Sequence, residues 1–598
     1  MALSILRQCK LASWGTRLAE RRPFPGRLVP PNMTCAWHFG ASVRLHRPRK
    51  PYARHEAGQR LSSTTSTIFT PQHGSFRIDY FSSSVHCNSR PGCNKWRVST
   101  AEVRSVFLLC LLACELLSMD NSRRTVSIHV LDDDSLLHVF HLCRPFVRNE
   151  DGPADWGYSG RWWYALAHVC RRWRNIVLGS ANYLGLFLLC TYGTPVVDML
   201  AHSPPLPLVV GYFRNDRELT TEDEEGIILA FKHRDRVRRV RLYSTGTILQ
   251  KLIVAMDDEY PILEYLYITL PLDDNNMILR FPGTLQAPHL RHLELQGFAL
   301  PIGSPLLTTA VGLVTLDLAM IHPSTYFHPN TLLQWISFMP YLEMLKIRFE
   351  FSIPNRDVER QLRHTPIITP IALPNLHVLY FRGVSAYLEA VVHRITTPRL
   401  EKLEINFFNQ LTFSVPRLLQ FIIAAENFRL SSAALYFSNK SAGVGVYPHA
   451  VYPLEETANF KTRLYTLAIL VNCCHLDWQA SSMAQISSSL SQIFSEVEHL
   501  YLQRNVHSES SGDHNDVDHA EWRKLLRPFS NVKTLRIHRG LVKDLSRCLE
   551  LEDGGLPLEL LPKLQRIAFL GRGNTGGALT SFIDTRRNAG RPVTLVRF

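Results

Sequence analysis

The sequence predicts an α/β protein in which a short all-helical module precedes an irregular solenoid of helix–strand repeats. Three observations lead to this prediction. Residues 1–118 are basic and lack a sustained hydrophobic period, residues 125–185 carry two apolar helical segments, and residues 230–598 repeat one apolar pattern. The N-terminal segment is therefore expected to be disordered, and residues 186–229 are expected to connect the module to the solenoid.

The basic character of the chain is confined to its N-terminal segment. Residues 1–100 contain sixteen Lys and Arg but only three Asp and Glu, so they carry nearly all of the net charge of +14. The nearly neutral remainder argues against a general nucleic-acid surface. The first 28 residues are Arg-rich and acid-poor, as in a mitochondrial transit peptide. A disordered basic tail and an upstream extension of the gene model, with the true start at Met119, are the alternatives.

Cysteine usage and hydropathy point to a reducing compartment, and we expect the protein to be cytoplasmic or nuclear. Twelve cysteines are scattered without a CxxC pair, which is typical of buried thiols. Cys473-Cys474-His475 lacks the four-ligand spacing of a zinc site, so we expect core packing and no metal. The apolar run at 105–117 is shorter than the roughly 20 residues that span a bilayer. No membrane partner is therefore expected.

The solenoid prediction rests on a recurring pattern in which apolar residues occupy the first, fourth and sixth positions. Successive copies begin 23 to 35 residues apart. They start at Val237, Leu263, Leu290, Leu313, Leu342, Leu376, Leu400, Leu464, Val497, Val532 and Leu564, with a weaker copy at Ser432. Each copy ends in strand-like alternation, and helical segments precede the strands within 330–347, 415–428 and 520–537. Helix–strand units at this period are the signature of a leucine-rich-repeat-like solenoid, whose units stack to bury one continuous core.

The basic run at 232–243 belongs to the same pattern. Alone it would suggest phosphate binding. However, Val237, Val240 and Leu242 fall on the repeat register. We therefore expect a first solenoid strand whose arginines alternate outward into solvent.

Ahead of the repeats, residues 127–145 and 161–180 each place apolar side chains on one helical face. Asp132, Asp133 and Asp134 suit the first turn of a helix, where the helix dipole favours anions. Consecutive helical positions point in different directions, so these acids are expected to cap the helix rather than to bind a metal. Residues 161–180 are expected to form a strongly amphipathic helical segment, which must bury its apolar face against the core or a partner.

These two segments resemble the F-box. VLDDDSLLHVF is similar to its opening, with Asp132 in place of the usual proline, and LAHVCRRWRNIV is similar to its closing half. A polar insertion at 146–161 separates them. The arrangement of an F-box before leucine-rich repeats resembles that of F-box-like proteins common in mushroom-forming fungi.

The resemblance implies a three-helix module that binds the Skp-type adaptor of a cullin–RING ubiquitin ligase, with an unidentified target protein held by the repeats. Some of the matching residues would pack the module and others would meet the adaptor. The residues that match are Leu131, Asp134, Leu136, Val139, Phe140, Val169, Cys170, Trp173 and Ile176.

Two rival functions remain open at this point. A leucine-rich-repeat scaffold that recruits no ligase would need neither the adaptor nor the F-box. An enzyme could use Gly571-x-Gly573-x-x-Gly576, which follows a strand as a dinucleotide-binding turn does. Because the chain continues for only one further strand-like run, we expect a glycine-rich connection there, no cofactor and no catalytic residues.

Overall fold

The computed structural model describes residues 70–72, 75–77, 131–144, 162–213, 217–271, 278–301, 303–322, 325–350, 370–408, 410, 412–425, 427–428, 430–449, 465–473, 476–505, 519–549, 560–570 and 577–597. It divides into a unit of Met1–Leu111 and a unit of Leu112–Phe598. In the first unit, where the sequence predicts no order, β1 (Thr70–Gln72) and β2 (Ser75–Arg77) pair as an antiparallel hairpin. The transit-like stretch and the apolar run at 105–117 lie outside the described residues.

Within the described residues, the second unit begins with four helices. They are α3 (Asp133–Leu142), α5 (Trp162–Ala167), α6 (Arg171–Gly179) and α7 (Ala181–Leu184). Helix α6 packs against each of the other three. We call these four helices the helical module.

A sheet of sixteen strands follows within the part of the chain that the structure describes. The strands are β3 (Leu188–Cys190), β4 (Leu208–Tyr212), β5 (Val237–Tyr243), β6 (Tyr265–Thr269), β8 (His292–Gln296), β10 (Thr315–Ile321), β11 (Met344–Phe349), β13 (Val378–Gly383), β15 (Lys402–Phe407), β16 (Ser432–Ser438), β17 (Ser441–Tyr447), β18 (Leu467–Asn472), β19 (His499–Asn505), β20 (Thr534–His538), β21 (Arg566–Leu570) and β22 (Thr594–Arg597). All neighbouring strands are parallel except where β17 pairs with β16 and β18. The outlying pairs β7 (Leu279–Arg280) with β9 (Phe298–Ala299) and β12 (Ile371–Ala372) with β14 (Ile395–Thr396) are separate.

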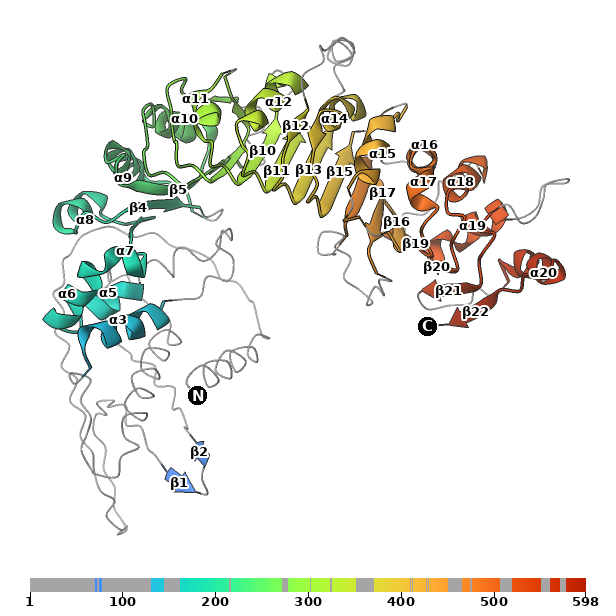
Figure 1. Cartoon of the computed structure of the whole chain (residues 1–598), viewed down its shortest axis with the longest axis horizontal. Helices are drawn as coiled ribbons and strands as arrows, with labels where there is room; N and C mark the ends of the chain where they lie inside the picture. Colours follow the sequence, from blue (N-terminus) through green and yellow to red (C-terminus); the bar gives the residue numbers. More distant parts are fainter. Residues whose placement is uncertain are drawn as a thin grey trace, which may run out of the picture. The chain divides into compact units, whose positions relative to one another are not determined.

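Helices connect most of the strands and cover one side of the sheet (Figure 1). They are α8 (Val196–His202), α9 (Thr221–Lys232), α10 (Gly246–Val254), α11 (Pro305–Thr309), α12 (Pro329–Ser337), α14 (Ser385–Val392), α15 (Pro416–Ile423), α16 (Leu476–Ser489), α17 (Ser491–Phe494), α18 (His519–Leu526), the 3₁₀ turn η5 (Arg539–Leu541), α19 (Val542–Leu549) and α20 (Thr580–Asn588). The helices predicted within 330–347, 415–428 and 520–537 are confirmed as α12, α15 and α18. Pro329 and Pro416 occupy first-turn positions, where the missing amide hydrogen costs nothing.

The repeat pattern places one apolar face of every strand against the helices. In β11 and β15, for example, buried and half-buried residues alternate strictly. Leu345, Ile347, Leu403 and Ile405 are at most 1% exposed. All twelve copies of the pattern carry a strand, which makes the chain from β3 onward a leucine-rich-repeat-like solenoid.

The structure corrects two features of the predicted solenoid. The interval 186–229, expected to be a connector, contributes β3 and β4 to the sheet, so β5 is the third strand and not the first. The copies at Ser432 and Leu464 do not follow the order of the sequence, because β18 pairs with β15, and β16 pairs with β19. A tight turn between Ser438 and Ser441 reverses the chain after β16, so that β17 lies between β16 and β18. In this turn the Ser438 hydroxyl accepts the Ser441 amide at 3.0 Å.

Candidate functional site

The helical module has a small core built by residues that the sequence proposed for partner binding. Leu136 and Phe140 of α3 are fully buried, and Trp173 and Ile176 of α6 are 5% and 9% exposed. The Phe140 and Trp173 rings pack with their centroids 4.8 Å apart. These four side chains therefore pack between α3 and α6.

The acidic run at the start of α3 caps the helix, as predicted. The Asp132 carboxylate accepts the Ser135 amide at 2.6 Å, and Asp133 and Asp134 lie in the first turn. This hydrogen bond satisfies one of the free amides at the helix start and lowers the pKa of Asp132. Asp132 thus has a local structural role in starting α3.

The segment 161–180 does not form one continuous helix, which corrects the sequence prediction. The chain leaves α5 after Ala167, and Cys170 takes an extended conformation as the N-cap of α6. Its Sγ atom accepts the Trp173 amide at 3.5 Å. The Arg174 side chain donates to the Ala167 carbonyl at 3.0 Å, so it satisfies an acceptor that the break exposes.

The helical module also leaves apolar side chains on its surface. Val169 is 59% exposed there, and Leu142 at the end of α3 is 49% exposed. Among the other proposed residues, Asp134 is exposed and Leu131, Val139 and Cys170 are half-buried. The residues proposed from the F-box resemblance therefore fall into two groups. Some form a buried core, and others lie on an accessible surface.

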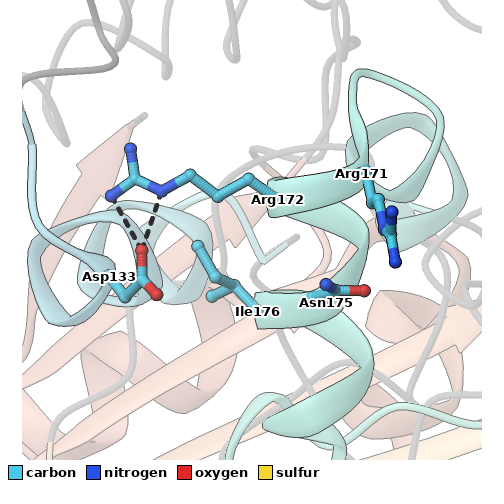
Figure 2. Close-up of a pocket in the computed structure, with 5 residues that line it drawn as sticks. All are labelled: Asp133, Arg171, Arg172, Asn175 and Ile176. Atoms are coloured by element: carbon cyan, nitrogen blue, oxygen red, sulfur yellow. Dashed lines mark hydrogen bonds and ion pairs between the residues drawn. The ribbon is translucent and has the colours of Figure 1, made fainter.

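A shallow hollow lies where α3 meets α6, and Asp133, Arg171, Arg172, Asn175 and Ile176 line it. Figure 2 shows Arg172 reaching across from α6 to the Asp133 carboxylate, while Arg171 points away from that pair. The Arg172 Nη2 atom lies 2.7 Å from the Asp133 oxygen and also donates to the Leu131 carbonyl. Arg172 thus ties α6 to the start of α3, a role that the sequence did not indicate.

The helical module is attached to the first strand of the sheet. The Trp163 indole of α5 donates to the Phe187 carbonyl, immediately before β3, at 3.3 Å. Helix α7 ends at Gly185 in the left-handed conformation, with φ at +62°, and the Leu186 amide returns to the Ala181 carbonyl. Glycine is favoured at this helix end because other residues are strained in that conformation.

A second candidate surface is the side of the sheet that faces away from the helices, which we call the open face. The pairing register aligns Arg241, Tyr267, Glu294, Asp317, Lys346, Tyr380 and Glu404 in one row across β5 to β15. The apolar positions of each copy, on which the solenoid prediction rests, do not indicate this row. The residues of this row all stand at the fifth position of their copies, between the second and third apolar residues of the pattern.

The acidic side chains on the open face accept hydrogen bonds from neighbouring side chains. The Asp317 side chain is 4% exposed and accepts two hydrogen bonds from Arg348, at 2.7 and 2.8 Å. Glu294 accepts the Tyr265 hydroxyl at 3.4 Å, and burial together with the nearby Asp317 carboxylate raises its pKa. The Glu404 carboxylate accepts the Tyr465 hydroxyl.

Arg241 corrects the expectation of a solvated basic strand. It is only 2% exposed, because its guanidinium stacks 3.7 Å from the centre of the Phe213 ring and 5.0 Å from that of Tyr267. Aromatic faces attract such cations. Neighbouring strands supply these rings, so alternation within β5 alone could not reveal the burial.

The remaining sequence candidates do not build a site in the described residues. Gly571, Gly573, Gly576, Cys474 and His475 lie outside them. Within the described part of the chain, no three His, Cys, Asp or Glu side chains gather as a metal site would require. Searched over the same residues, the helices include none with the length and apolar character needed to span a membrane.

Comparison with known proteins gives a distant likeness to a solved structure. No protein-family model and no curated protein matches the chain. Among solved structures, a leucine-rich repeat-containing protein from Legionella pneumophila is similar, with 10% sequence identity and a TM-score of 0.23. The similarity covers 68% of this chain and 99% of that one.

Proposed function

We propose that this protein is a substrate-receptor subunit of a cullin–RING ubiquitin ligase. The helical module would bind the Skp-type adaptor, and the solenoid would bind a target protein. The observation that carries the proposal is the direct succession of a small, self-packed helical module with F-box-like residues and a long repeat solenoid attached to it. Trp163, which donates to the carbonyl of Phe187, links the two parts.

The proposal assigns the F-box-like residues two separate roles. Leu136, Phe140, Trp173 and Ile176 keep α3 and α6 together. Adaptor contact falls to the accessible side chains, above all to Val169, because burying an exposed valine in an interface yields about 1.5 kcal/mol or more. Asp134 and Leu142 lie on exposed positions of α3 and would extend this contact.

In this function the protein makes and breaks no bonds itself. A receptor that holds a target beside a ubiquitin-charged enzyme raises the effective concentration of the reacting groups. No cofactor or metal is needed for that role, and we propose that the protein is not an enzyme.

Co-purification with the Skp-type adaptor of the source organism tests the proposal. We expect the full chain to form a stable complex, and the surface variant V169D to weaken it by about tenfold or more, because a charge would be buried unpaired. V197D is the matched control, since Val197 is 65% exposed on α8, outside the module. The proposal fails if folded wild type forms no complex, or if V169D and L142D together leave the complex intact.

The alternative is a leucine-rich-repeat-like interaction scaffold without ligase recruitment. One observation favours it: Asp132 replaces the F-box proline and serves as a helix cap. Under this alternative the helical module only covers the first strand, as terminal caps of repeat proteins do. Absence of adaptor binding by the folded chain, with target binding retained, would identify this function.

A further inference from the structure

The open face between β5 and β15 concentrates positive charge in an otherwise nearly neutral body. Its registered positions carry the basic residues Arg239, Arg241, Lys346, Arg348, Arg382 and Lys402. They carry the acidic residues Glu294, Asp317 and Glu404. The face therefore has an excess of positive charge, and this excess attracts anions before any contact is made.

The acidic groups on this face already have partners within the fold. Asp317 is bound by Arg348, and the Lys346 ammonium lies 3.6 Å from it. Glu404 accepts from Tyr465 and lies 3.7 Å from Lys402. Glu294 accepts the Tyr265 hydroxyl at 3.4 Å. These groups are thus poorly placed to attract a basic partner.

The positive charge is densest where β11 meets β13. Arg348 and Arg382 occupy paired positions on these adjacent parallel strands, whose backbones are separated by about 4.8 Å. Burial lowers the pKa of Arg382 and the neighbouring charge of Arg348 acts in the same direction, whereas Tyr380, Tyr326 and Glu350 act in the opposite direction. An anion placed between the two guanidinium groups would relieve that repulsion and accept charge-assisted hydrogen bonds.

This region is accessible to a ligand. The side chains of Arg348 and Lys402 are each 37% exposed, and that of Lys346 is 30% exposed. Tyr380 lies between Lys346 and Glu404 in the pairing register. Its ring offers an apolar surface beside the charges, which suits a peptide more than a free ion.

We propose that the open face over β10 to β15 binds an anionic segment of the target protein, with a carboxylate or phosphate group held by Arg348 and Arg382. The inference rests on the proposed function, because it names the chemistry of the target that the receptor would recruit. Carboxylate and phosphate offer the same oxygen acceptors to guanidinium groups. Peptides that carry one or the other group separate these two sources.

Fluorescence anisotropy with the full chain, in the absence of the adaptor, tests this inference. The probes are labelled peptides of equal length: an oligoglutamate peptide, a phosphoserine-containing peptide and a neutral oligoglutamine peptide. We expect one or both anionic peptides to bind and the neutral peptide to bind at least about tenfold more weakly. The stronger anionic peptide identifies the source of the charge, and its binding should weaken as salt is raised.

The variant R382Q distinguishes the proposed site from general electrostatic attraction. It should weaken anionic peptide binding by about tenfold, since it removes the guanidinium charge and leaves a neutral polar side chain. R587Q is the control, because it removes the same charge from α20, where the Arg587 side chain is 68% exposed. Equal binding by R382Q and wild type, or no anionic binding by folded protein, overturns the inference. Anionic binding without adaptor binding would reject only the ligase function.

Discussion

Arg348 of β11 binds both carboxylate oxygens of Asp317 on the neighbouring strand β10, at 2.7 and 2.8 Å. The Asp317 side chain is 4% exposed, whereas that of Arg348 is 37% exposed. A buried carboxylate without a charge partner is costly, so Asp317 depends on Arg348 more than Arg348 depends on Asp317. The same arginine would also bind an anionic ligand, which connects the stability of the sheet to its proposed recognition surface.

Replacing Arg348 by methionine should destabilise the protein by about 2 kcal/mol, because it removes two charge-assisted hydrogen bonds from a buried carboxylate. Urea unfolding measures the loss. In the double variant R348M/D317N the cost should fall below the sum of the two single costs by about 1 kcal/mol or more, since the amide needs no charge partner. Additive costs would show that the pair does not stabilise the sheet.

Glu294 should make stability depend on pH. Its pKa is raised in the folded protein by burial and by the Asp317 carboxylate. The folded state therefore binds the proton more tightly than the unfolded state, and stability falls as pH rises from the ordinary carboxyl range through the raised pKa. The charged form then penalises folding at neutral pH.

The variant E294Q should accordingly unfold at higher urea concentration than wild type at pH 7, and its advantage should shrink as pH is lowered toward 4.5, the unperturbed value. The Tyr265 hydroxyl can still donate to the amide oxygen. E401Q, at an exposed position next to β15, is the matched control. An E294Q difference that stays constant with pH would contradict the prediction.

Gly443 should be required by the inserted strand β17. A Cβ atom there would lie 2.8 Å from the Ile469 carbonyl oxygen on β18 and 3.1 Å from Leu470. Because a backbone atom cannot easily move aside, G443A should destabilise the sheet by about 1–3 kcal/mol in urea unfolding. In G312A the added Cβ meets nothing within 4 Å, and the expected change is within about 0.5 kcal/mol. Equal effects of the two variants would show that β17 is not tightly packed.

The repeated strands were predictable from the sequence because the apolar positions within each copy indicate which residues of the strand are buried. Leu345 and Ile347 alternate with Lys346 in β11 as the pattern requires. The position of a strand in the sheet depends on its partners, and the pattern does not contain that information. The reversed order of β16 to β18 follows from a hairpin turn at Ser438–Ser441, and such a turn inside a repeat array was not anticipated.

The candidate site was predictable in part for the same reason. The F-box resemblance grouped Phe140, Val169 and Trp173 in one set, but it could not separate core from surface. The break at Cys170 decides this separation: it turns Val169 outward and lets Trp173 pack on Phe140. The burial of Arg241 likewise depends on rings from other strands, which no local pattern shows.

Trp173 should be essential to the helical module and Val169 should not. Trp173 is 5% exposed, and its ring packs against Phe140. W173A should therefore destabilise the module by about 3–5 kcal/mol, whereas the conservative W173F should cost less because it leaves a smaller cavity.

Hydrogen exchange of the α3 and α6 amides measures this loss without relying on the unfolding of the whole solenoid, because repeat proteins lose structure locally. In W173A these amides should exchange much faster while those of β10 and β11 keep their protection. V169D should leave both groups protected and lower only adaptor binding, which separates loss of the interface from loss of the fold. Protection of α3 and α6 that survives in W173A would mean that contacts other than the Phe140–Trp173 pair hold the module together.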